Sequence, residues 1–339
     1  VTVSEGPYVS ARAVTLTLAA ANAVYYRASE DPDFADPALG DAGESWRPYP
    51  AGQSAPFTLS DADGEHTIWV AFSDGTTAST PASASVVLDR QAPGSPSVTI
   101  GDGGGYTRAV GGVVTLSLSA LDLPAQAGAA VSGIDRMELA HDPGFAGAVR
   151  VDYQLTTTWA LASPSVQGEK AVWVRFLDRA GNVSAPAGAT VILDTEAPAD
   201  PAISLLGAPP APAGYSASTL VTATLDASDA NQGTGKANLL VRLSNTAGFV
   251  GARYQPFAGT HAWVLAPGDG PKTVWAQFMD PAGNESLPVS AGLILDATAP
   301  LAPVVGLVEQ DSRPTNGYTN KLTVGVSISA GGSPAAAQL

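Results

Sequence analysis

Short stretches of alternating apolar and polar residues run through the whole chain. Residues 14–18 place Val14, Leu16 and Leu18 on one side, and residues 114–118 and 221–225 show the same alternation. A period of two puts successive side chains on opposite faces of a strand, so one face is expected to pack on a core. The pattern predicts an all-β protein with about seven short strands per unit and no helix of useful length.

A longer pattern repeats along the chain. Three apolar segments contain a tryptophan and end in aspartate: 67–74, 171–178 and 273–280. Each leads into a second apolar strand that ends in Leu-Asp, at Asp89, Asp194 and Asp296, and then into an Ala-Pro step. These Leu-Asp marks lie 105 and 102 residues apart, which is the length of one β-sandwich domain.

The repeat predicts tandem immunoglobulin-like (fibronectin-III-like) β-sandwiches in an elongated array. The boundaries are residues 1–92 (repeat 1), 93–197 (repeat 2), 198–299 (repeat 3) and 300–339, an incomplete fourth repeat with its first strands only. Two prolines at each junction restrict the backbone, so we expect limited bending between repeats. Both ends are expected to be cuts through a longer array. Truncation of the fourth repeat is favoured over its completion by strands from another chain.

Composition narrows the function classes. Hydrophobic residues make up 45% of the chain, which is enough for a core in each repeat. The net charge of −15 repels phosphate backbones, so nucleic acid is not an expected partner. The chain has no cysteine, which excludes disulfides, zinc–thiolate sites and cysteine nucleophiles. No apolar run approaches the length of a membrane span, so no membrane insertion is expected within this segment.

Two turns carry a resemblance to a known family. Residues 178–182 and 280–284 read Asp-x-Ala-Gly-Asn, and each is followed by a strand and Leu-Asp-x-x-Ala-Pro. This combination resembles the bacterial Ig-like tandem repeats of large surface and secreted proteins. Repeat 1 departs from it, because Asp74-Gly-Thr-Thr-Ala stands in place of the turn. The resemblance implies an extracellular or cell-surface location and a role as stalk, spacer, adhesin shaft or accessory module beside a secreted enzyme.

The chain offers little for catalysis. Its three histidines, His66, His141 and His261, fall at three different places in the repeat, and we expect surface or turn residues. Asp178 and Asp280 are interpreted as turn residues whose carboxylates accept backbone N–H groups. The sequence therefore predicts no enzyme activity.

Calcium is the alternative considered for the junctions. Asp89, Asp194, Glu196 and Asp296 are the acids available there, and calcium binds six to eight oxygen ligands. The junctions are poor in acids and uneven, so the favoured interpretation is that these residues cap strand ends. No cofactor is expected.

One tryptophan per repeat is expected on the outer face of its sheet. Val172, Val174 and Phe176 alternate with Trp173 and Arg175, and the apolar side should face the core. Trp69, Trp173 and Trp275 then point outward. The favoured interpretation is that each ring lies flat across its own sheet. A lateral contact for bundling and a carbohydrate platform are the alternatives. Trp159 and Trp263 are assigned to the core.

These observations predict a non-catalytic structural segment of a bacterial extracellular protein, acting as the stalk or shaft of an adhesin, filament or sheath. Its expected partners are neighbouring repeats of the same chain and other copies of the protein in a fibre. The alternative is a set of carbohydrate- or protein-binding accessory modules of a secreted multidomain enzyme.

Overall fold

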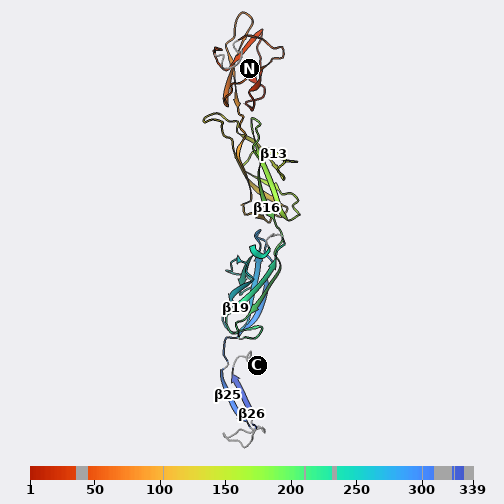
Figure 1. The fold of residues 1–339 in the computed structure, drawn as a ribbon, viewed down its shortest axis with the longest axis vertical. Helices are drawn as coiled ribbons and strands as arrows, with labels where there is room; N and C mark the ends of the chain where they lie inside the picture. Colours follow the sequence, from red (N-terminus) through yellow and green to blue (C-terminus); the bar gives the residue numbers. More distant parts are fainter. Residues whose placement is uncertain are drawn as a thin grey trace. The chain divides into compact units, whose positions relative to one another are not determined.

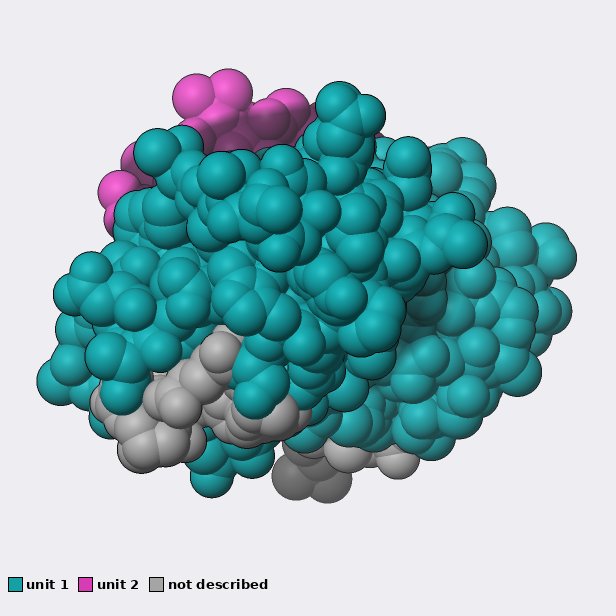
Figure 2. Space-filling view, turned by 90° about the horizontal axis from the view of Figure 1, so that it is seen from above, with its two compact units in different colours: residues 1–194 teal, residues 195–339 magenta. Residues whose placement is uncertain are grey.

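The regular secondary structure of the described residues is almost entirely β-strand. The computed structural model describes residues 1–35, 45–101, 103–209, 211–230, 235–299, 301–308, 323 and 325–331. Within these ranges the one helical element is a single 3₁₀ turn, η2 (Gly235–Asn238). The chain divides into two compact units, residues 1–194 and 195–339 (Figure 2, teal and magenta).

Repeat 1 forms the first sandwich of unit 1. Its strands are β1 (Thr2–Val3), β2 (Tyr8–Val9), β3 (Ala13–Thr17), β4 (Tyr25–Ser29), β5 (Arg47–Pro48), β6 (Ser54–Thr58), β7 (Gly64–Ser73) and β8 (Ala82–Leu88). A three-stranded sheet has the order β1-β3-β6, and a five-stranded sheet has the order β2-β8-β7-β4-β5.

Repeat 2, whose strands β13 and β16 are labelled in Figure 1, forms the second sandwich of unit 1. Its sheets have the same order of strands as those of repeat 1. Its strands are β9 (Gly94–Ile100), β10 (Tyr106–Thr107), β11 (Val113–Leu121), β12 (Ile134–Ala140), β13 (Val149–Asp152), β14 (Thr156–Ala160), β15 (Gly168–Asp178) and β16 (Ala187–Leu193). The sheets are β9-β11-β14 and β10-β16-β15-β12-β13.

Unit 2 contains the third sandwich and a separate hairpin. The strands of the sandwich are β17 (Ala199–Leu206), β18 (Tyr215–Ser216), β19 (Leu220–Ser228), β20 (Leu240–Ser244), β21 (Gln255–Pro256), β22 (Thr260–Val264), β23 (Gly270–Met279) and β24 (Val289–Leu295). They form sheets β17-β19-β22 and β18-β24-β23-β20-β21. The hairpin pairs β25 (Leu301–Val308) with β26 (Gly325–Gly331). The remaining residues of the fourth repeat lie outside the described ranges.

The predicted immunoglobulin-like fold class is confirmed by this topology. All strand pairs are antiparallel except the short parallel pairs of β2 with β8, β10 with β16 and β18 with β24. The described residues give eight strands per sandwich where about seven were expected. The difference is the second strand of each repeat (β2, β10 and β18), whose two residues are too few to show a period. The predicted boundaries between repeats stay predictions.

Each sandwich has its own apolar core, built from the alternation seen in the sequence. Val172, Val174 and Phe176 on β15 are fully buried, as are Val274, Ala276 and Phe278 on β23. Burying a side chain such as Phe176 stabilises the fold by about 1.5–3 kcal/mol relative to leaving it exposed. The three cores together provide the main driving force for folding. No helix in the described part of the chain is both long and apolar enough to cross a bilayer.

Candidate functional site

The three repeated tryptophans lie on the outer faces of the five-stranded sheets, and each is half-buried. Small residues stand opposite each ring on both neighbouring strands: Ser29 and Ser83 for Trp69, Ala140 and Gly188 for Trp173, and Ser244 and Ser290 for Trp275.

Trp173 shows why the neighbours are small. A Cβ atom at Gly188 would lie 2.8 Å from two atoms of the Trp173 ring, so the indole lies directly across β16. This contact accords with the interpretation that the ring packs flat on its own sheet. Trp159 and Trp263 pack partly buried against the cores of repeats 2 and 3, as assigned from the sequence.

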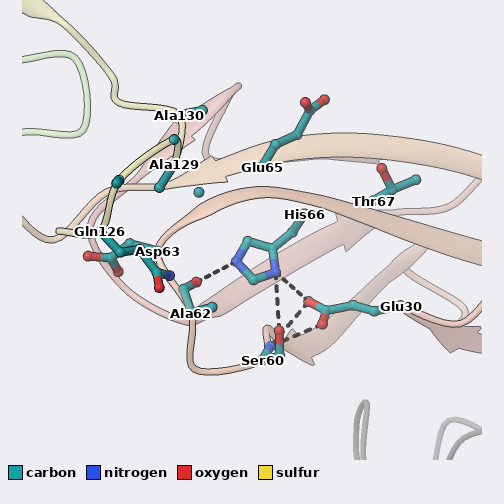
Figure 3. Close-up of a pocket in the computed structure, with 13 residues that line it drawn as sticks. Glu30, Ser60, Ala62, Asp63, Glu65, His66, Thr67, Gln126, Ala129 and Ala130 are labelled. Atoms are coloured by element: carbon teal, nitrogen blue, oxygen red, sulfur yellow. Dashed lines mark hydrogen bonds and ion pairs between the residues drawn. The ribbon is translucent and has the colours of Figure 1, made fainter. Parts of the chain in front are cut away.

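His66 differs from the expectation of a surface or turn histidine. It lies within β7, is only 7% exposed, and its Nδ1 lies 2.9 Å from the Glu30 carboxylate (Figure 3). Its Nε2 lies 2.8 Å from the carbonyl oxygen of Ala62. The alternation of β7 turns His66 inward, and Glu30 provides the charge that makes burial acceptable.

The hydrogen bonds define the charge of His66. The Ala62 carbonyl only accepts, and so does the Glu30 carboxylate when it is ionised, so this geometry favours the protonated ring, in which both nitrogens donate. The hydrogen bond from His66 lowers the pKa of Glu30 against the opposing effect of burial. The same bond raises the pKa of His66.

Ser60 completes a cluster that only superficially resembles a hydrolase triad. Its Oγ lies 3.4 Å from His66 Nδ1, the same nitrogen that contacts Glu30. In a working triad the serine and the acid contact opposite ring nitrogens. Here the second nitrogen is held by a backbone carbonyl, so His66 has no free lone pair to act as a base. The cluster is interpreted as a buried ion pair.

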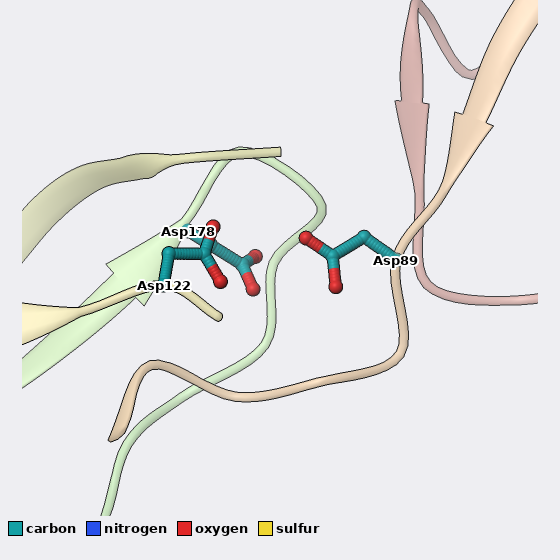
Figure 4. Close-up of side chains that lie close together, drawn as sticks. All are labelled: Asp89, Asp122 and Asp178. Carbon is teal, nitrogen blue, oxygen red and sulfur yellow. The ribbon is translucent and has the colours of Figure 1, made fainter. Parts of the chain in front are cut away.

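Three aspartates converge where repeat 1 meets repeat 2 within unit 1, and we call Asp89, Asp122 and Asp178 the acidic cluster (Figure 4). Each offers a carboxylate oxygen, and these three oxygens lie within 4.8 Å of one another. Asp89 follows β8, Asp122 follows β11 and Asp178 ends β15. Asp89 and Asp178 are 2% and 4% exposed, and Asp122 is half-buried.

Asp89 joins the linker to repeat 2. Its backbone N–H donates to Val9 in repeat 1, while its Oδ2 accepts from the N–H of Ser132 in repeat 2 at 2.7 Å. The side chain of Asn182 donates to the Asp89 carbonyl at 2.8 Å. The linker is therefore hydrogen-bonded on both sides, and this provides a physical reason for a restricted junction.

Asp178 is held by the turn that the family resemblance singled out. Its Oδ1 accepts from the Asn182 N–H and its Oδ2 from the Asn182 side chain, both at 2.8 Å. Gly181 adopts a φ of 91°, which favours glycine because it has no Cβ. The interpretation of Asp178 as a turn residue is confirmed, and the same geometry points it into the acidic cluster.

The acidic cluster has unbalanced negative charge. No Lys, Arg or His in the described ranges makes an ion pair with any of its three members. Asp122 Oδ1 is buried and has no hydrogen-bond partner there, although Oδ2 accepts from the Gly133 N–H at 2.6 Å. Burial, and then the charges of Asp89 and Asp178, raise the pKa of Asp122. Burial also raises the pKa of Asp178.

These properties fit a hard divalent cation. Carboxylate oxygens are the ligands that calcium prefers, and three aspartates offer up to about six of the six to eight oxygens it takes. A cation would supply the missing partner of Asp122 Oδ1. The repeat has the same residue type at the corresponding sequence positions, Asp194, Asp229 and Asp280.

Sequence reasoning identified part of this set. It named Asp89 at the junction but missed Asp122 and took Asp178 only as a turn residue. Of the other acids named for calcium, Asp194 is fully buried, Glu196 is exposed and Asp296 is half-buried. The signal for Asp122 was available: an aspartate directly follows the second long strand in repeats 2 and 3, at 122 and 229.

Comparisons with known proteins give the following. No protein-family model matches the chain. No curated protein matches its sequence.

Several solved structures align over most of the chain at low identity. The FN1–FN3 domains of chicken CNTN1 are 13% identical over 85% of this chain and 95% of theirs, with a TM-score of 0.35. A Ca²⁺-stabilized adhesin of an Antarctic bacterium, described as helping it to bind ice, is 17% identical over 92% of this chain and 77% of its own, with a TM-score of 0.32. The Escherichia coli adhesin FdeC is 15% identical over 87% and 96%, with a TM-score of 0.36. At these values none of them assigns a role to a residue of this chain.

Proposed function

We propose that this chain is a non-catalytic structural segment of a bacterial extracellular or cell-surface protein, acting as a stalk or adhesin shaft. The observation that carries the proposal is the recurrence of one sandwich, with the same strand order and the same core positions, in three successive repeats. Repetition of one fold suits a spacer, because each added repeat extends the reach of the chain.

The acidic cluster gives the spacer a means of stiffening. Asp89 belongs to the linker, whereas Asp122 and Asp178 belong to repeat 2, so a cation bound by all three ties the linker to the next sandwich. Without the cation the three carboxylates repel one another in a partly desolvated place. We therefore propose that calcium rigidifies the junction between repeats 1 and 2.

The test is small-angle scattering and electron microscopy of the chain in calcium and in chelator, together with microscopy of the protein on cells. Single projecting rods support a stalk or shaft, whereas ordered fibres with lateral contacts support a filament or sheath. A particle size distribution that is the same with and without calcium would contradict the stiffening proposal. Association of the repeats with a catalytic domain in the native protein would favour the alternative, accessory modules of a secreted enzyme.

A further inference from the structure

Repeat 1 exposes two aromatic side chains in one place. Tyr25 on β4 is 39% exposed and Trp46 just before β5 is 38% exposed. No other aromatic residue in the described ranges is as exposed as these two. Both line the same pocket of about 340 Å³ with Ser73, Gly75, Thr76 and Thr77, and we call it the aromatic pocket. This volume falls in the range of about 300–1,000 Å³ that is typical of small-molecule sites.

The aromatic pair is specific to repeat 1. Strand register places Arg136 and Leu240 where repeat 1 has Tyr25. It places Arg150 and Tyr254 where repeat 1 has Trp46. The third component is also specific, because residues 74–78 replace the Asp-x-Ala-Gly-Asn turn of the other repeats. The Tyr25 position and the loop therefore depart from both other repeats and meet in one pocket, whereas the Trp46 position keeps an aromatic residue, Tyr254, in repeat 3.

The loop of the aromatic pocket is held by hydrogen bonds to Asp74. Asp74 Oδ1 accepts from the Thr76 N–H and Oγ1, both at 2.7 Å, and from the Thr77 N–H at 2.8 Å. Its Oδ2 accepts from Thr77 Oγ1 at 3.2 Å. The backbone N–H groups of Thr77 and Thr76 keep the pKa of Asp74 far below its ordinary value, so the loop stays intact over the physiological pH range. A site organised before binding loses less entropy when it binds.

The hydrogen-bonding groups at the rim suit a polyhydroxylated ligand. Thr76 and Thr77 donate their hydroxyl hydrogens to Asp74, so their oxygens retain lone pairs with which to accept. Ser73 Oγ accepts from the Gly75 N–H at 3.0 Å and keeps its own hydrogen to donate. Gly75 adopts a φ of 98°, which favours glycine, so the turn of the loop depends on this residue.

The aromatic rings suit the other part of such a ligand. Arg27 stacks 5.0 Å from the centroid of the Trp46 ring and 4.1 Å from that of Phe34, which fixes the orientation of the indole. A sugar ring has one face of C–H groups that packs on an aromatic ring and a rim of hydroxyls that exchange hydrogen bonds. The one charged group at the loop is Asp74, and both of its carboxylate oxygens already accept hydrogen bonds from Thr76 and Thr77. The chain also carries a net charge of −15, which repels an anionic ligand. An uncharged sugar therefore fits better than an acidic one.

We propose that the aromatic pocket of repeat 1 binds a neutral saccharide, with its ring stacked on Trp46 and Tyr25 and its hydroxyls bonded to Ser73, Thr76 and Thr77. The site goes beyond the structural role, because it would allow repeat 1 itself to bind a glycan. A single shallow site of this size is expected to bind with a Kd of about 1 mM.

The test is saturation-transfer NMR and tryptophan fluorescence of the whole chain with four neutral disaccharides: cellobiose, maltose, lactose and chitobiose. Trp46→Ala and Tyr25→Ala are expected to weaken binding at least about tenfold, whereas Tyr25→Phe retains it because the ring remains. Tyr254→Ala, at the position of repeat 3 that corresponds to Trp46, is the matched control and is expected to bind like the unmodified chain. Thermal melting of each variant verifies that repeat 1 is folded.

Absence of binding by all four disaccharides at about ten times the expected Kd would overturn the proposal. So would binding that Trp46→Ala leaves unchanged. Binding that persists in chelator is expected, because the aromatic pocket is remote in the fold from the acidic cluster. The outcome is therefore separable from that of the calcium test.

Discussion

At the scale of single residues, buried charge is the feature that most distinguishes this chain from a generic sandwich. Two groups of ionisable side chains in unit 1 lie in partly desolvated places. One, Glu30 with His66, is balanced by opposite charge, and the other, the acidic cluster, is not. Ionisation should therefore stabilise the fold at the first group and destabilise it at the second.

Asp122→Asn in the acidic cluster should stabilise the chain in chelator and destabilise it in calcium. Because the folded-state pKa of Asp122 is raised, its ionisation destabilises unit 1 progressively as pH rises above the ordinary value of 3.8. Asp122→Asn removes that charge and should raise the melting temperature at neutral pH in chelator. In calcium the same variant should lose stabilisation that amounts to about 2.7 kcal/mol at 100 times the Kd.

Calorimetry in calcium and in chelator measures both effects. Asp152→Asn, an exposed acid of repeat 2 outside the acidic cluster, is the control and should change neither value. An undiminished calcium response in Asp122→Asn would place the cation elsewhere.

The ion pair of His66 predicts a bounded pH range of stability. The raised pKa of His66 means that its contribution is complete below the ordinary value of 6.5 and is lost as pH rises through the folded value. The lowered pKa of Glu30 means that its contribution is present above 4.5 and is lost as pH falls through the folded value. The pair should stabilise repeat 1 most between these limits.

Melting temperature as a function of pH tests this directly. Between pH 4.5 and 6.5, where the contribution of the pair is complete, Glu30→Gln should lower stability by about 3 kcal/mol, because it leaves His66 without its charged partner. It should also flatten the fall in stability below pH 4.5 and above pH 6.5. A profile of Glu30→Gln parallel to that of the unmodified chain would show that the pair does not control this range.

At the scale of strands, the outer-face tryptophan depends on the absence of side chains beside it. Gly188→Val should force Trp173 off β16 and cost about 1–3 kcal/mol through overpacking. Ser290→Ala, at the corresponding position beside Trp275, should be nearly neutral because a Cβ is already present there. Chemical denaturation of each variant measures the two costs, and equal costs would contradict a specific role for Gly188.

The strands also show what the sequence could and could not predict. Alternation at residues 172–176 correctly predicted the buried face, since burial follows the two-residue period of a strand. It did not predict β2 or β10, whose two residues carry no period. It also did not predict that His66 would be inward and charged, because the partner Glu30 is 36 residues away. The recurrence of aspartate at 122 and 229 was visible in the sequence, but the proximity of Asp122 to Asp89 and Asp178 depends on tertiary structure.

At the scale of the whole chain, the two proposed binding sites belong to the same compact unit. Unit 1 contains both the acidic cluster and the aromatic pocket. If the proposals hold, a fragment of residues 1–194 should retain the calcium response and the saccharide binding of the full chain. Isothermal titration of that fragment tests this, and loss of either property would show that unit 2 contributes to it.

The contact between Asn182 and the carbonyl of Asp89 makes the order of the repeats matter. The Asn of the Asp-x-Ala-Gly-Asn turn closes its own hairpin and also grips the linker that precedes its sandwich. Repeat 1 has Ala78 at the corresponding position and so cannot grip a preceding linker in this way. A shuffled gene that moved repeat 1 behind another repeat would encode the same sandwiches and the same linkers, yet it would contain a loose joint. The repeats are therefore not interchangeable, because one amide side chain decides whether a repeat can hold the linker that precedes it.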